Sequence, residues 1–272
     1  MERMQQTTEN LERLAEGCHE QRPYEERNPG EERNLKGTAM KRVRVKEFMD
    51  DPELPPREHQ RALLGLERLN ALTGVARPIW QAIASFVNGR GNQQPSILDI
   101  GSGAGDLIES CQRRAKKAGM TPVWTASDYN PRTVELLAKR FAQKQITASA
   151  RCLDVCAQEP WGEYDLVLCN LFLHHFDPPQ VVAIFRSMKA SAKRGVIVGD
   201  LSRSRLNWFL VWLGCHAVSR SYVVIHDGLA SVEAAYTPSE IRDLAEEAGL
   251  QGARVQNCFP CRWILRWERP AS

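Results

Sequence analysis

Three glycines at alternate positions form the part of this sequence best suited to hold a ligand through its backbone. Residues 95–106 read PSILDIGSGAGD, so that Gly101, Gly103 and Gly105 directly follow a short apolar run. Glycine adopts positive φ without steric cost and lets a ligand approach the backbone, and a helix opening at Asp106 would present unpaired N–H groups. The pattern predicts a buried strand that enters a nucleotide-binding turn.

Carboxylates follow at the ends of neighbouring predicted strands. Asp128 comes a little under thirty residues after the glycines, the distance typical of a carboxylate that accepts both hydroxyls of a ribose. Asp154 ends the next strand, where it can meet an exocyclic amine, and Asp99 lies inside the first strand, where it can orient the turn or a ligand ammonium. Because ligands of open α/β sheets bind at the carboxyl ends of the strands, we expect these groups to face one site.

Histidines supply the candidates for proton transfer, since histidine titrates near neutral pH. His174 and His175 follow the predicted strand 164–169 by a few residues, and the alternative is that they only pack the loop onto the next helix. His226 precedes Asp227 and Gly228, so it is either a base oriented by a carboxylate or part of an Asp-Gly turn.

The elements that must position these residues alternate along the chain. Apolar runs and caps predict helices and strands in regular succession from 106 onwards: helices 106–118, 131–142, 179–192, 206–218 and 237–248, with strands 122–127, 146–152, 164–169, 195–199, 253–258 and 262–267. Such alternation is typical of a parallel sheet covered by helices on both faces.

The N-terminal part divides differently. Residues 1–40 are rich in charged and amide side chains and predict a poorly ordered tail, and residues 41–92 predict a helical cap with helices 58–72 and 76–87. These helices either cover a cleft or pack against the sheet edge. The main domain then spans residues 93–272, with a helical lid at about 203–236.

Composition and charge argue against some classes of protein. The 272 residues carry a net charge of +3, which gives no footprint of nucleic-acid binding, and the apolar run 206–218 is too short to span a bilayer. We expect a cytoplasmic protein whose eight cysteines are reduced. Cys258 and Cys261 have the spacing of metal ligands, but a zinc site needs two more ligands and none lies nearby, so we expect no metal site.

Four segments in order, LDIGSGAGD, SDYN, CLDV and DLVLCNLFLHHF, resemble the class I S-adenosylmethionine-dependent methyltransferases. The resemblance covers about residues 97–267 and is to the small-molecule type; the overall organisation also resembles, less strongly, bacterial methyltransferases of secondary metabolism. The resemblance implies a Rossmann-like three-layer αβα sandwich with a seven-stranded sheet in the order 3-2-1-4-5-7-6, whose last strand is antiparallel. It also implies S-adenosylmethionine as cofactor and S-adenosylhomocysteine as product.

The same resemblance implies which residues bind each part of S-adenosylmethionine: the methionine portion, the ribose, the adenine and the methyl-donor side. The residues implied are Asp99, Gly101, Ser102, Gly103 and Gly105, then Asp128, Tyr129, Asp154 and Val155, and finally Asn170 and Leu171. The segment FLHHFDPPQ is similar to the His-Asp-Trp segment of O-methyltransferases, which implies His174 as general base, although His175 stands where that family has an acidic residue.

We therefore predict methyl transfer to oxygen or carbon of a small hydrophobic acceptor, such as a phenolic, polyketide-like or quinone-like molecule. One alternative is a noncatalytic protein that binds S-adenosylmethionine. Another is an RNA or nucleobase methyltransferase, although Asn170 is followed by Leu-Phe-Leu rather than the Pro-Pro-aromatic segment of those enzymes. A dehydrogenase would need the glycine spacing G-x-G-x-x-G. We expect no nucleic-acid partner; transient membrane contact fits a lipophilic acceptor, and the oligomeric state stays open.

Overall fold

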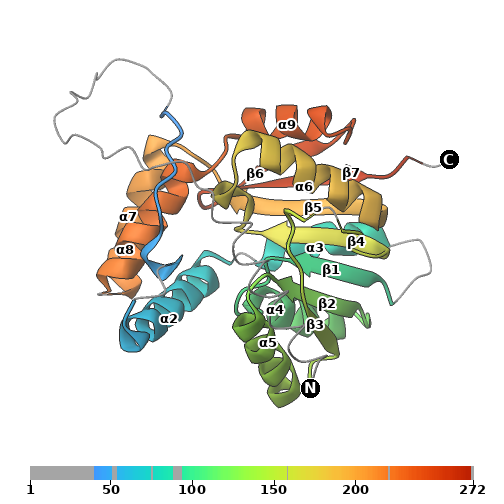
Figure 1. The fold of residues 1–272 in the computed structure, drawn as a ribbon, viewed down its shortest axis with the longest axis horizontal. Helices are drawn as coiled ribbons and strands as arrows, with labels where there is room; N and C mark the ends of the chain where they lie inside the picture. Colours follow the sequence, from blue (N-terminus) through green and yellow to red (C-terminus); the bar gives the residue numbers. More distant parts are fainter. Residues whose placement is uncertain are drawn as a thin grey trace, which may run out of the picture. The chain divides into compact units, whose positions relative to one another are not determined.

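The computed structural model describes residues 40–50, 54–74, 76–87, 94–157, 159–219 and 221–270, and the predicted tail lies outside them apart from Met40. Seven strands form one sheet in the order β3-β2-β1-β4-β5-β7-β6 (Figure 1). Their bounds are β1 (Ser96–Ile100), β2 (Val123–Asp128), β3 (Ala148–Cys152), β4 (Tyr164–Asn170), β5 (Ala192–Leu201), β6 (Arg254–Cys258) and β7 (Arg262–Glu268). β1 to β5 run parallel and β7 is antiparallel to both neighbours, so the predicted fold class is confirmed.

Helices cover both faces of this sheet (Figure 1). One face carries α6 (Pro178–Ser191) and α9 (Pro238–Glu247), and the other carries α3 (Ala76–Val87), α4 (Asp106–Lys117) and α5 (Pro131–Lys144). The pleat of β1 divides its side chains between the two cores: Leu98 packs with the α6 and α9 side, and Ile97 with the α3, α4 and α5 side.

Local sequence signals set where these helices begin. The Asn130 side chain accepts a hydrogen bond from Arg132 N, and Pro131 occupies the first turn of α5. Thr237 and Glu240 form the capping box predicted at the start of α9.

A second group of helices lies beside the carboxyl ends of the strands (Figure 1): α2 (Pro56–Thr73), α7 (Arg205–Val218) and α8 (Tyr222–Ala234). Of the two helices predicted for residues 41–92, only α2 joins this group, because α3 buries Ile79, Ile83 and Phe86 against the sheet. The interpretation of Asp227-Gly228 as a turn is wrong. These residues lie inside α8, where Gly228 packs so close to Cys215 of α7 that a Cβ would come within 2.9 Å.

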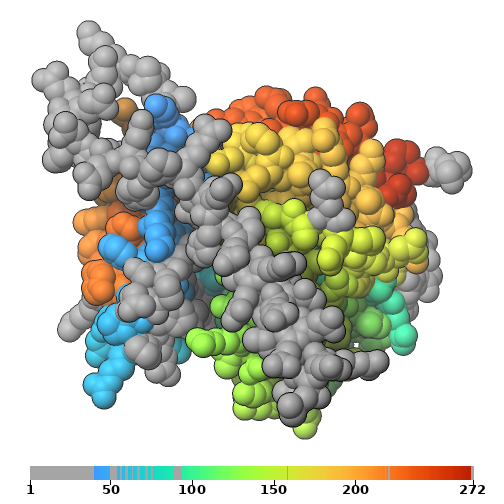
Figure 2. Space-filling view, viewed as in Figure 1, coloured from blue at the N-terminus to red at the C-terminus, as the bar shows by residue number. Residues whose placement is uncertain are grey.

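An N-terminal segment, residues 40–50, lies along α8 and is called the strap below. It ends in the short helix η1 (Phe48–Asp50), and a further short helix, η2 (Leu173–His175), follows β4. The Val43 N–H donates to Glu233 O at 3.0 Å, and Arg42 Nε donates to Ala234 O at 2.6 Å. Figure 2 shows this blue segment at the surface next to the orange helices α7 and α8. Among the described residues, no helix combines the length and apolarity needed to cross a membrane.

Candidate functional site

The turn after β1 offers a ligand one open position. Gly101, Gly103 and Gly105 all have positive φ, at 65°, 50° and 77°. A Cβ on Gly101 would lie 2.3 Å from the Phe172 ring, and one on Gly105 would lie 2.7 Å from Leu137, whereas a Cβ on Gly103 would meet nothing within 4 Å. Gly101 and Gly105 are therefore required by the protein's own packing, and Gly103 is the glycine that leaves room for a ligand.

Asp128 lies directly on this turn. Its Oδ2 accepts a hydrogen bond from Gly103 N at 3.3 Å, and its Oδ1 accepts one from Asn130 N at 3.0 Å. Burial raises the pKa of this carboxyl group, although these amide hydrogen bonds oppose the shift. The neighbouring Tyr129 side chain is 64% exposed, which leaves its ring available to a bound molecule.

Asp154 extends the same edge of the sheet by one strand. Leu153 N donates to Asp128 O at 3.0 Å, which holds the end of β3 beside the end of β2. Asp154 Oδ1 accepts a hydrogen bond from Cys156 N at 2.8 Å, and Val155 between them is buried. The two carboxylates thus lie at the carboxyl ends of adjacent parallel strands, next to the glycine turn.

Asp99 is a buried carboxyl group below the turn. It is 2% exposed, its Oδ2 has no hydrogen-bond partner within the described part of the chain, and burial raises its pKa to about 7. Ser102 Oγ donates to the Asp99 backbone carbonyl at 2.9 Å and so fixes the turn from beneath. A buried oxygen without a partner is uncommon, and it is suited to receive a ligand cation or a water.

Asn170 and Leu171 end β4 on the other side of the turn. Leu171 has φ 55°, a left-handed conformation that is strained for a residue other than glycine, and its N–H donates to Gly199 O at 2.8 Å. Strain of this kind persists where surrounding structure enforces it, often at functional sites.

The next strand end carries a buried histidine and its carboxylate partner. His174 is 3% exposed, its Nδ1 lies 2.7 Å from Asp200 Oδ1, and its backbone N–H donates to Asp200 Oδ2 at 3.2 Å. An ionised carboxylate only accepts, so Nδ1 carries the hydrogen and Nε2 points toward Glu47 Oε1, 3.9 Å away. Burial alone would lower the pKa of His174, but Asp200 and Glu47 outweigh it and raise that pKa, and the paired histidine lowers the pKa of Asp200.

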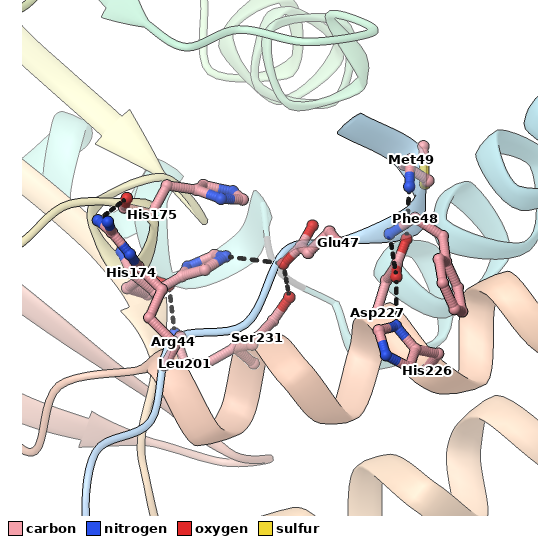
Figure 3. Close-up of polar contacts among 12 residues, drawn as sticks. Arg44, Glu47, Phe48, Met49, His174, His175, Leu201, His226, Asp227 and Ser231 are labelled. Carbon is pink, nitrogen blue, oxygen red and sulfur yellow. Dashed lines mark hydrogen bonds and ion pairs between the residues drawn. The ribbon is translucent and has the colours of Figure 1, made fainter. Parts of the chain in front are cut away.

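Glu47 and His175 complete this group (Figure 3). Ser231 Oγ of α8 donates to Glu47 Oε1 at 2.6 Å, and the His175 ring lies 4.2 Å from the His174 ring, centroid to centroid. Burial and the neighbouring His174 lower the pKa of His175 to about 3. Side-chain ligand atoms of Glu47, His174 and His175 all lie within 4.8 Å of one another.

Comparison with known proteins agrees with this geometry. Residues 97–195 match the model of a family described as a methyltransferase domain, and the strand order of the sheet is that expected for such a domain. The chain has the class I methyltransferase fold.

Several solved methyltransferase structures share this fold. Human N-acetylserotonin methyltransferase in complex with S-adenosylmethionine is 16% identical with a TM-score of 0.55, over 79% of this chain and 57% of that one. An O-methyltransferase family 2 protein from Planctomyces limnophilus in complex with apigenin is 15% identical with a TM-score of 0.55, over 80% and 63%. A plantazolicin methyltransferase with S-adenosylhomocysteine is 16% identical with a TM-score of 0.54, over 79% and 88%.

The chain therefore spans about three fifths of the length of the first two of these enzymes. No curated protein matches it in sequence. The structural likenesses establish the methyltransferase fold.

His226 lies apart from His174 and His175. Its Nδ1 is 2.9 Å from Asp227 Oδ1 and its ring stacks on Phe48 at 4.0 Å. Figure 3 places it at the far end of the strap segment from His174. Asp227 in turn accepts hydrogen bonds from the backbone of Phe48 and Met49, which accounts for its burial without a catalytic role.

Sequence reasoning missed two residues of the site. Asp200 ends a parallel strand, as Asp128 does, so the same rule applied to β5 would have found it. Glu47 carries no such signal, because it belongs to a short irregular segment that only the tertiary structure brings to His174.

Proposed function

We propose that this protein transfers a methyl group from S-adenosylmethionine to a small organic acceptor. The observation that carries the proposal is the hydrogen bond from Gly103 N to Asp128 Oδ2. Gly103 is also the glycine of the turn beside which there is open space for a ligand. The hydrogen bond joins a backbone cradle to a carboxylate suited to ribose hydroxyls, at the sheet edge where ligands of this fold class bind.

The residues present fit the cofactor part by part. Asp128 would accept the ribose hydroxyls with Tyr129 beside the adenine, and Asp154 with Val155 would hold the adenine edge. Gly103 and the turn around Ser102 would contact the methionine portion, whose ammonium suits the unpartnered oxygen of Asp99. Asn170 and Leu171 would line the side from which the methyl group leaves.

Bound S-adenosylmethionine supplies an electrophilic methyl group on a sulfonium. The protein's own contribution is to align the acceptor with that methyl group and to exclude water, since alignment accounts for much of the rate of such displacements. Leu171, whose N–H is bonded to β5, its neighbour Asn170 and the buried His174 would form the acceptor's surroundings.

A cluster of buried and partly buried apolar side chains beside Leu171 supports a small hydrophobic acceptor. Leu171 packs with an apolar group contributed by β5, α7 and α8, comprising Leu201, Val232, Ala235, Trp208 and Val211. The likeness to a structure that holds apigenin supports the same class of acceptor. Phenolic, polyketide-like and quinone-like molecules, methylated at oxygen or carbon, are therefore the first acceptors to test.

Calorimetry and a transfer assay test this function. We expect S-adenosylmethionine and S-adenosylhomocysteine to bind and NAD⁺ not to bind, and we expect a panel of phenols and quinols to accept radiolabelled methyl groups. Binding of the dinucleotide alone would contradict the proposal. Cofactor binding without transfer to any acceptor would favour a noncatalytic binding protein, and methylation of RNA would favour a nucleobase enzyme.

A further inference from the structure

We propose that Glu47, His174 and His175 form a binding site for a divalent transition-metal ion, with Zn²⁺ as the representative ion. Two imidazoles and one carboxylate are a donor set that binds Zn²⁺ and leaves a coordination position open. Within the described residues, this is the set of such side chains whose ligand atoms converge, all lying within 4.8 Å of one another.

The separations are close to those that coordination needs. Metal–ligand bonds of about 2.0–2.2 Å place ligand atoms roughly 3–4 Å apart. The Glu47 Oε1 to His174 Nε2 distance is already 3.9 Å, and no pair in the group exceeds 4.8 Å. Small side-chain rotations would close the site, because the three residues approach one point from the strap and from η2 (Figure 3).

A second layer of contacts orients the ligands as metal sites require. Asp200 accepts the hydrogen of His174 Nδ1 at 2.7 Å, which fixes the tautomer in which Nε2 offers its lone pair. Ser231 Oγ donates to Glu47 Oε1 at 2.6 Å and so orients the carboxylate. Both supporting contacts point the donor atoms toward the same small volume.

The strap that carries Glu47 is fixed on both sides of that residue. Arg44 donates to His175 O at 2.7 Å on one side, and the Phe48 N–H donates to the buried Asp227 on the other, at 2.8 Å. Both carboxylates are shielded from solvent, since Asp200 is 1% exposed and the Glu47 side chain 16% exposed, and two neighbouring arginines, Arg42 and Arg44, donate to the backbone carbonyls of His174 and His175. A divalent cation would offset the charge of both carboxylates where solvation is reduced.

The location suggests a use that rests on the proposed function. An ion held by Glu47, His174 and His175 would lower the pKa of an acceptor hydroxyl bound to it, and the hydroxyl proton would pass to water. The acceptor oxygen then forms its bond to the methyl carbon as the carbon–sulfur bond breaks, with its electron pair passing to sulfur. His174 would have no free ring nitrogen in this arrangement, so metal binding and the predicted role of His174 as general base exclude each other.

Metal binding by the untagged full chain tests the proposal without any knowledge of the acceptor. After treatment with EDTA, titration with Zn²⁺ alone should reveal one strong site, and Co²⁺ should give the visible absorption of a low-coordinate nitrogen and oxygen site. Glu47→Gln and His175→Asn should each weaken Zn²⁺ binding by at least about 10-fold, and Asp200→Asn by about 10–100-fold, because supporting residues set ligand orientation.

Matched controls separate this site from other metal-binding groups. His216→Asn alters an exposed histidine of α7, and Cys258→Ser with Cys261→Ser removes the thiol pair, so both variants should bind Zn²⁺ as wild type does. Circular dichroism checks that each variant is folded, and Ser231→Ala, a milder change, should weaken binding several-fold in a folded protein.

Failure to bind Zn²⁺ in wild type would overturn the proposal, as would unchanged binding by folded Glu47→Gln and His175→Asn. Titration of the same samples with S-adenosylhomocysteine keeps the two proposals distinct. A wild type that binds S-adenosylhomocysteine but not Zn²⁺ rejects only the metal site, and a wild type that binds Zn²⁺ but not S-adenosylhomocysteine rejects only the methyltransferase function.

Discussion

Asp227 Oδ1 accepts a hydrogen bond from the backbone N–H of Phe48 at 2.8 Å, so that a buried side chain of α8 holds the strap in place. Its other oxygen accepts the Met49 N–H at 3.0 Å. Asp227→Ala leaves both N–H groups without their acceptor and should lower the free energy of unfolding by about 2–3 kcal/mol in urea denaturation. Asp243→Asn, at an exposed position of α9, should leave it unchanged, and equal stability of the two variants would contradict this role.

Gly101 and Gly103 should respond differently to the same substitution. Gly101→Ala forces a Cβ to within 2.3 Å of the Phe172 ring and should leave little folded protein. Gly103→Ala has space but retains a positive φ, so it should cost only about 1 kcal/mol of stability. The methyl group of Ala at position 103 would occupy the open space of the glycine turn. It should weaken S-adenosylhomocysteine binding, measured by calorimetry, by more than about 10-fold.

Gly119→Ala provides the matched control for this pair. Gly119 also has positive φ, at 69°, and a Cβ there would meet nothing within 4 Å, but it follows α4 in an exposed turn. The variant should lose similar stability and bind S-adenosylhomocysteine normally. Normal binding by Gly103→Ala would place the cofactor elsewhere.

Asp99 should make the stability of the unliganded protein fall as the pH rises. Burial raises its folded pKa to about 7, above the ordinary value of 3.8, so the folded state keeps a proton that the unfolded chain has lost. The protonated Asp99 contributes its full stabilisation below the unfolded pKa, and this stabilisation is lost as the pH rises from the unfolded pKa through the folded pKa. The whole shift in pKa corresponds to roughly 4 kcal/mol of stability, of which about 3 kcal/mol is lost between pH 5 and pH 8. Urea denaturation at pH 5 and pH 8 should reveal a steeper fall for wild type than for Asp99→Asn, and parallel behaviour would refute this assignment.

Asp128 should carry much of the cofactor affinity. Asp128→Asn removes the charge that would strengthen hydrogen bonds to ribose hydroxyls and should weaken S-adenosylhomocysteine binding by about 10–100-fold, because hydrogen bonds to charged groups contribute about 1.5–3 kcal/mol. Asp243→Asn is again the control. The stability of Asp128→Asn, measured by thermal unfolding, should stay near wild type, so that an unfolded variant is not mistaken for a binding defect.

Local signals in the sequence determined the sheet and the part of the site proposed to bind the cofactor. Apolar runs fixed the strands, the glycines fixed a turn with positive φ, and the strand-end rule located Asp128 and Asp154. These features depend on residues close together in the chain and on a strand order common to the fold. Their positions therefore follow from periodicity and turn chemistry.

Tertiary packing alone decided the rest. Asp227-Gly228 carries a turn signal, yet burial of Val223, Val224 and Ala230 and close packing of Gly228 on α7 place the pair inside a helix. Glu47 reaches His174 only because hydrogen bonds to α8 hold the strap there, and those contacts join segments from opposite ends of the chain. No periodicity within a segment encodes such a long-range contact, which forms when apolar faces pack and bring distant polar groups together.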